Sequence, residues 1–129
     1  MAKRNKILLI EDEVYLIKIY GNKLKMSGFD VSVATTGDEG LHKVMTDKPD
    51  LILLDLILPA GKDGFQVLEE IKKNPSTKKT PVIILSNLGQ QSDIESCMSL
   101  GAVDYLVKAD VSLPNVVEKI KKYLSPANK

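Results

Sequence analysis

Five apolar runs of strand length recur along the chain. Each run is rich in Ile, Val and Leu and lacks the polar alternation of a half-exposed strand, which is typical of parallel strands buried on both faces. The expected strands are residues 6–10, 30–34, 50–58, 80–86 and 102–108. This pattern predicts a parallel β-sheet.

The segments between these runs carry apolar residues at helical spacing. In residues 13–27, Leu16, Tyr20 and Leu24 recur every four residues and form a stripe that faces a core. The expected helices are residues 13–27, 37–46, 64–73, 90–100 and 113–124. Because crossovers between parallel strands are right-handed, the order (βα)5 predicts an α/β fold with a doubly wound five-stranded parallel sheet and helices on both faces. Such a fold binds ligands beyond the carboxyl ends of its strands.

Length and charge exclude several classes of protein. A chain of 129 residues is a single domain of common size, which we place at residues 1–129. Its 18 Lys and Arg and 17 Asp and Glu give a net charge of +1, too balanced for a protein held by nucleic-acid phosphates or an anionic membrane. The sequence has a single cysteine, Cys97, no signal peptide and no apolar stretch long enough to span a membrane. We therefore expect a soluble, cytoplasmic monomer or weak dimer that binds neither nucleic acid directly nor membrane.

Polar side chains close four of the five expected strands. Glu11 and Asp12 follow the first strand, and Asp55 lies near the end of the third. Ser86 closes the fourth strand and Lys108 closes the fifth. Because the carboxyl ends of parallel strands meet at one edge, three carboxylates would repel one another there, and Mg²⁺, which prefers oxygen ligands, would relieve the repulsion. With a hydroxyl and an ammonium group beside them, the set suits phosphoryl transfer.

Each of these residues also has an ordinary structural interpretation. Glu11 and Asp12 suit the start of a helix, Ser86 suits an N-cap, and Lys108 suits a solvated surface. Asp55 is different, because it interrupts an apolar run where a purely structural aspartate would be an unpaired buried charge. The coincidence of polar residues on successive strand ends favours function.

With these residues, the whole chain resembles the receiver domain of two-component response regulators. The matching segments are the acidic pair in ILLIEDE, Asp55 in LILLDLILP, Ser86 in VIILSN, and YLVK ending in Lys108. The resemblance implies a flavodoxin-like fold in which Asp55 accepts a phosphoryl group from the phosphohistidine of a sensor histidine kinase or a phosphotransfer protein.

The resemblance also implies a role for each site residue. It implies four Mg²⁺ ligands, which are the side chains of Glu11, Asp12 and Asp55 and the backbone carbonyl of Ile57. Ser86 and Lys108 would hold the phosphoryl oxygens. Tyr105, three residues before Lys108, matches the switch aromatic that turns inward when the hydroxyl moves toward the phosphoryl group.

Two protein-binding surfaces are expected. Tyr15, Ile19 and Asn22 are spaced by four and three residues, so they share a face of the first expected helix. In the resembled family this face docks the kinase. The surface from the fourth helix through Tyr105 to the fifth helix is the expected contact with a downstream protein target.

The leading hypothesis is a stand-alone response regulator, because the chain ends five residues after Leu124, and the alternative is the receiver part of a longer regulator. Such a protein is no metabolic enzyme, although it catalyses its own phosphorylation and dephosphorylation. An aspartate-nucleophile phosphohydrolase would need a second carboxylate at Ile57. A flavin or dinucleotide carrier would need a glycine- or hydroxyl-rich loop where residues 11–13 are acidic.

The sequence departs from the family pattern in several places. One extra residue lies between Pro59 and the pair Asp63-Gly64, so we expect a reshaped loop over the site. Ala109 replaces the usual proline after the lysine, and because a cis bond before alanine costs about 2.5 to 4 kcal/mol, we expect a trans peptide and a displaced loop.

Two apolar residues near the site predict a long-lived phosphoaspartate. Ile57 and Leu88 stand where other receivers can carry polar side chains that orient the hydrolytic water. Neither offers a hydrogen bond, and Asn87 occupies a position that is normally small. We therefore expect slow self-dephosphorylation.

His42, on the second expected helix, is expected to be an ordinary surface residue.

Overall fold

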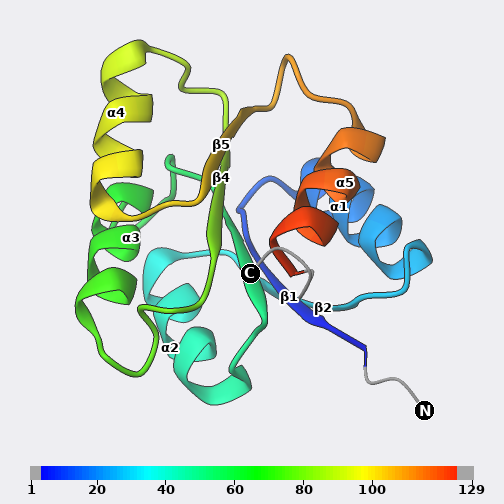
Figure 1. The fold of residues 1–129 in the computed structure, drawn as a ribbon, viewed down its shortest axis with the longest axis horizontal. Helices are drawn as coiled ribbons and strands as arrows, with labels where there is room; N and C mark the ends of the chain where they lie inside the picture. Colours follow the sequence, from blue (N-terminus) through cyan, green and yellow to red (C-terminus); the bar gives the residue numbers. More distant parts are fainter. Residues whose placement is uncertain (1–3, 125–129) are drawn as a thin grey trace.

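Five parallel strands form one sheet between two layers of helices in the computed structural model, which describes residues 4–124 (Figure 1). The strands are β1 (Lys6–Ile10), β2 (Asp30–Ala34), β3 (Leu51–Leu54), β4 (Val82–Ser86) and β5 (Asp104–Val107). The helices are α1 (Val14–Met26), α2 (Gly37–Asp47), α3 (Gly64–Lys73), α4 (Gln91–Leu100) and α5 (Leu113–Leu124). The strand order is β2-β1-β3-β4-β5, so the expected doubly wound α/β fold is confirmed.

The core has two halves, one on each face of the sheet. Leu8 and Ile10 of β1 enter the half covered by α2, α3 and α4, whereas Ile7 and Leu9 enter the half covered by α1 and α5 (Figure 1). Successive side chains of a strand point to opposite faces, so a strand covered on both sides must be apolar throughout. Burial of each such side chain contributes roughly 1.5–3 kcal/mol.

The third strand is shorter than the sequence pattern predicts. β3 ends at Leu54, so the expectation of strand through residue 58 is wrong over its last four residues. The apolar run continues because Leu56 is 1% exposed in the core, although the chain has already left the sheet there. Ile57 is 56% exposed. The fourth and fifth strands also begin two residues later than expected, at Val82 and Asp104.

The structure also shows the surroundings of several single residues. Cys97 is fully buried, and burial raises the pKa of its thiol to about 11. His42 is exposed on α2. The described residues contain no cis peptide bond, so the expected trans bond between Lys108 and Ala109 is confirmed. None of the helices in residues 4–124 has the length and hydropathy of a membrane span.

Candidate functional site

Three carboxylates meet at the carboxyl edge of the sheet. Glu11 and Asp12 follow β1, and Asp55 follows β3, the neighbouring strand, in which Leu54 pairs with Ile10. The amide of Asp55 donates to the carbonyl of Ile10 at 3.0 Å, so the sheet pairing continues into the site. One oxygen from each carboxylate lies within 4.8 Å of the others. The sheet register thus brings together residues that are more than forty positions apart.

Lys108 joins two of these carboxylates. Its amide donates to the carbonyl of Ser86 at 2.9 Å, which fixes the residue at the end of β5. Its Nζ lies 2.6 Å from Glu11 Oε1 and 2.8 Å from Asp55 Oδ2. The side chains of Lys108, Glu11 and Asp55 are 8%, 2% and 7% exposed. One ammonium group among three carboxylates leaves an excess of negative charge, which a further cation would compensate.

The buried position changes the proton affinity of these groups. Burial raises the pKa of Glu11 above its ordinary value, and the hydrogen bond from Lys108 only partly opposes that effect. Burial lowers the pKa of Lys108, but its hydrogen bonds to Asp55 and Glu11, together with the negative charges of these two groups, outweigh burial and raise the pKa overall. Lys108 therefore stays charged at neutral pH.

The donor set fits Mg²⁺. All three side chains of the cluster offer carboxylate oxygens, the hard ligands that Mg²⁺ prefers, and exposed Asp12 leaves the cluster open to solvent. The backbone supports the buried carboxylates, since Ile57 N–H donates to Asp55 Oδ1 at 3.2 Å and Glu13 N–H donates to Glu11 Oε2 at 3.1 Å. The Ile57 backbone thus lies beside Asp55.

Ser86 and Tyr105 lie together on the neighbouring strands. Ser86 is fully buried at the end of β4, and its Oγ accepts a long hydrogen bond of 3.4 Å from the amide of Leu88. The Tyr105 ring packs against the core, and its hydroxyl donates to the carbonyl of Leu88. Burial raises the pKa of Tyr105 to about 12. Both side chains therefore bond to one residue of the β4–α4 loop, so a movement of that loop would reach both.

The three expected docking residues lie along α1. Tyr15 is 71% exposed, Asn22 is exposed, and Ile19 is half-buried. Val14 and Met26, which the sequence pattern did not single out, are 66% and 85% exposed on the same helix. The helix thus presents an exposed apolar surface that is larger than predicted.

The loop between β3 and α3 contains contacts that the sequence analysis missed. Asp63 accepts from the amide of Gln66 at 2.9 Å, and the Gln66 side chain accepts from the amide of Asp63 at 2.9 Å. These two bonds form a capping box. Its sequence motif is Asp followed three residues later by Gln, so the sequence alone could have predicted it. Lys62, just before it, forms ion pairs with Asp38 and Glu70, which no local motif indicates.

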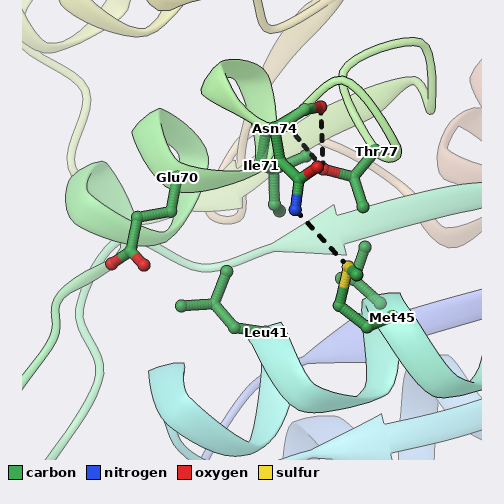
Figure 2. A pocket seen from close by; sticks show the side chains of 7 residues that line it. Leu41, Met45, Glu70, Ile71, Asn74 and Thr77 are labelled. Atoms are coloured by element: carbon green, nitrogen blue, oxygen red, sulfur yellow. Dashed lines mark hydrogen bonds between the residues drawn. The ribbon is translucent and has the colours of Figure 1, made fainter.

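A cavity between α2 and α3 is separate from the acidic cluster. Its volume is about 170 Å³, and Figure 2 shows that Met45 and Asn74 face each other across it. Its polar groups are already used, because Thr77 Oγ1 donates to the Ile71 carbonyl at 2.7 Å and the Asn74 amide nitrogen lies 3.6 Å from the Met45 sulfur. The cavity is also smaller than typical ligand pockets.

The fold and this cluster define the class of protein: a doubly wound α/β protein with a cluster of three carboxylates at the carboxyl edge of its sheet. Residues 7–121 match the family model of the response regulator receiver domain. The chain therefore belongs to the receiver domain family of two-component response regulators.

Comparison with curated sequences supports the assignment to this family. The chain is 33% identical over 122 residues to the phosphate regulon transcriptional regulatory protein PhoB of Rhizobium meliloti (strain 1021), an alignment that covers 95% of this chain and 53% of PhoB. The chain spans about half the length of the curated relatives it matches.

Two solved structures show the same fold. The BeF3-activated N-terminal receiver domain of Klebsiella pneumoniae RstA superposes with a TM-score of 0.86 at 28% identity, covering 93% of this chain and 98% of that one. The Mn²⁺-bound form of response regulator Rcp1 has a TM-score of 0.81 at 30% identity, covering 95% of this chain and 96% of that one.

Proposed function

We propose that Asp55 accepts a phosphoryl group from the phosphohistidine of a histidine kinase or a phosphotransfer protein, in a reaction that requires Mg²⁺. The observation that carries the proposal is the buried Asp55 carboxylate, joined to Lys108 inside an acidic cluster at the carboxyl edge of the sheet. The phosphoacceptor step is the same whether the receiver acts alone or within a longer regulator.

In the proposed transfer, an oxygen of Asp55 attacks phosphorus as the bond from phosphorus to the histidine nitrogen breaks. Lys108 and the Ser86 hydroxyl hold the oxygens of the transferred group. Glu11, Asp12, Asp55 and the Ile57 carbonyl would hold the metal, which would neutralise charge between the anionic donor and the acidic cluster.

The output of the proposed reaction is a change of protein contacts. Lys108 and Ser86 contact the phosphoryl group, and Tyr105 and Ser86 share the Leu88 backbone as a partner. Displacement of Ser86 toward the phosphoryl group would therefore alter the surface formed by α4, β5 and α5, which we propose as the contact with a downstream protein. The protein would act as a cytoplasmic signalling phosphoacceptor and turn over no metabolite.

The direct test is intact-mass analysis after incubation with Mg²⁺ and acetyl phosphate. The wild-type chain should gain one base-labile phosphoryl group, which should map to Asp55, and Asp55→Asn should gain none. Asp47→Asn is the matched control, since Asp47 lies at the end of α2, near the amino end of β1. Equal labelling of Asp55→Asn and wild type would refute the assignment.

A second experiment tests the proposed kinase-docking surface. Alanine at Tyr15, Ile19 and Asn22 should slow phosphoryl transfer from the cognate kinase without slowing labelling by acetyl phosphate, because these residues lie outside the acidic cluster. Loss of both activities would indicate that α1 has been disrupted.

A further inference from the structure

The loop of residues 57–63 begins and ends against the backbone of Asp55. Gly64 N–H, at the far end of the loop, donates to the carbonyl of Leu56 at 2.9 Å. A Cβ on Gly64 would lie 2.3 Å from the carbonyl oxygen of Asp55, so only glycine allows this approach. The loop therefore leaves and re-enters the body of the protein beside Asp55.

The Lys62 side chain connects the tip of this loop to two helices. Ala60 has a φ of 55° and Gly61 a φ of 89°, and non-glycine residues rarely adopt such a left-handed conformation. Lys62 follows this turn, and its Nζ lies 3.2 Å from Asp38 Oδ1 and 3.4 Å from Glu70 Oε2. Asp38 belongs to α2 and Glu70 to α3, so Lys62 ties the loop to two helices.

The same loop carries the backbone that contacts Asp55. Ile57 N–H donates to Asp55 Oδ1 at 3.2 Å, and its side chain is 56% exposed, so packing holds Ile57 only weakly. Leu58 packs against the core, and the backbone carbonyl of Lys62 lies 2.8 Å from the place of a Cβ on Gly37. Lys62 is the loop's only cation, since its other charged residue is Asp63.

We propose that Lys62 is a positioning residue: by tying the 57–63 loop to α2 and α3, it holds the Ile57 backbone against Asp55 and thereby strengthens Mg²⁺ binding. This inference rests on the proposed function, in which the Ile57 carbonyl is a metal ligand. In that reaction the same contact speeds phosphoryl uptake on Asp55. The role is indirect, because Lys62 pairs with Asp38 and Glu70 and not with the acidic cluster.

The sign of the effect separates positioning from simple electrostatics. Removal of a positive charge near a cation site weakens the repulsion of Mg²⁺, so Coulomb's law alone predicts tighter binding when Lys62 is neutralised. Loss of positioning predicts weaker binding. A neutral substitution therefore gives opposite results under the two explanations.

The experiment compares Lys62→Met with two control variants. Lys62→Arg keeps the charge, and Lys73→Met removes a different exposed lysine of the same region, which pairs with Glu69 at 3.1 Å. Mg²⁺ is titrated into each folded protein while the amide resonance of Ile57 is followed by NMR. Lys62→Met should bind Mg²⁺ more weakly, on the order of threefold given the modest strength of exposed ion pairs. Lys62→Arg and Lys73→Met should match the wild type.

A second background tests whether the effect passes through the ion pairs. In Asp38→Asn/Glu70→Gln, which removes both partners, Lys62→Met should cause no further weakening. The proposal is overturned if Lys62→Met binds Mg²⁺ as tightly as the wild type or more tightly, or if it weakens binding equally in both backgrounds. Failure of the proposed function gives a different result, namely a wild-type chain that binds Mg²⁺ but gains no phosphoryl group from acetyl phosphate.

Discussion

Two lysines of this molecule each bridge two carboxylates, in opposite environments. Lys108 is 8% exposed and lies 2.6 and 2.8 Å from its partners, whereas Lys62 is 37% exposed and lies 3.2 and 3.4 Å from its partners. Water and salt screen the exposed pairs, but a buried pair that loses one member leaves an uncompensated charge. The comparison assigns different tasks: Lys108 maintains the acidic cluster, and Lys62 adjusts the loop beside it.

The largest expected effect comes from breaking the buried pair. Lys108→Met leaves Glu11 and Asp55 buried together without a counter-ion, so it should lower the free energy of unfolding by about 3–5 kcal/mol in the absence of Mg²⁺. Mg²⁺ should restore part of that loss, because it supplies positive charge at the same carboxylates. Urea unfolding with and without Mg²⁺ measures both effects.

Lys62→Met is the control for this prediction. It also removes a lysine that bridges two carboxylates, but its partners are solvated, so the unfolding midpoint should stay close to that of the wild type. Equal destabilisation by the two variants would show that burial does not separate these sites.

A smaller effect is expected at the exposed edge of the cluster. Asp12 is exposed, so Asp12→Ala removes a metal ligand without leaving a buried charge. Mg²⁺ affinity should fall on the order of a hundredfold. Loss of a residue that only supports a metal ligand already lowers affinity by up to about that factor, and Asp12 is itself an expected ligand. The unfolding free energy without Mg²⁺ should not decrease. Calorimetric titration gives the affinity, and an unchanged affinity would remove Asp12 from the ligand set.

The sequence predicted the acidic cluster well because its geometry follows from the sheet. Glu11 and Asp55 each follow a strand, and neighbouring parallel strands end at the same edge, so their proximity needs no knowledge of any loop. Lys108 follows from the same rule. The position of the Tyr105 side chain could not be predicted in this way, because its hydroxyl bonds to the Leu88 carbonyl, which only the folded loop supplies.

The loop was less predictable for a physical reason. The apolar run through Leu56 and Leu58 looks like a strand, since periodicity alone cannot distinguish a buried strand from a buried loop. The extra residue near Pro59 predicted a reshaped loop. It did not predict that Lys62 would pair with Asp38, 24 positions away. Such a long-range contact is set by tertiary packing and leaves no local pattern.

The exposed loop offers a third test, at Ile57. Ile57 is 56% exposed and its side chain is apolar, so it offers no hydrogen bond that could orient a water molecule at Asp55. Ile57→Asn should speed the decay of the phosphorylated protein on the order of tenfold, below the roughly hundredfold contribution of a positioned catalytic group. Decay of the purified phosphoprotein in Mg²⁺ measures the rate, and an equal or slower rate would reject this explanation. Ile57→Val, which stays apolar, is the matched control.

The smallest expected effect lies on the other side of the site, at Tyr105. Tyr105→Phe removes the hydroxyl that donates to the Leu88 carbonyl, which should cost about 0.5–1.5 kcal/mol of unfolding free energy at neutral pH. The folded pKa is raised from 10.0 to about 12, so the neutral hydroxyl contributes fully below pH 10, and its contribution is lost as pH rises toward 12. The difference between wild type and Tyr105→Phe in urea unfolding should therefore be constant from pH 7 to 9 and shrink above pH 10.

Tyr15→Phe, at a site that is 71% exposed, is the control and should show no difference in unfolding free energy from the wild type at neutral pH. A Tyr105→Phe difference that disappears already below pH 9 would show that the Tyr105 hydroxyl is not held in this partly buried hydrogen bond.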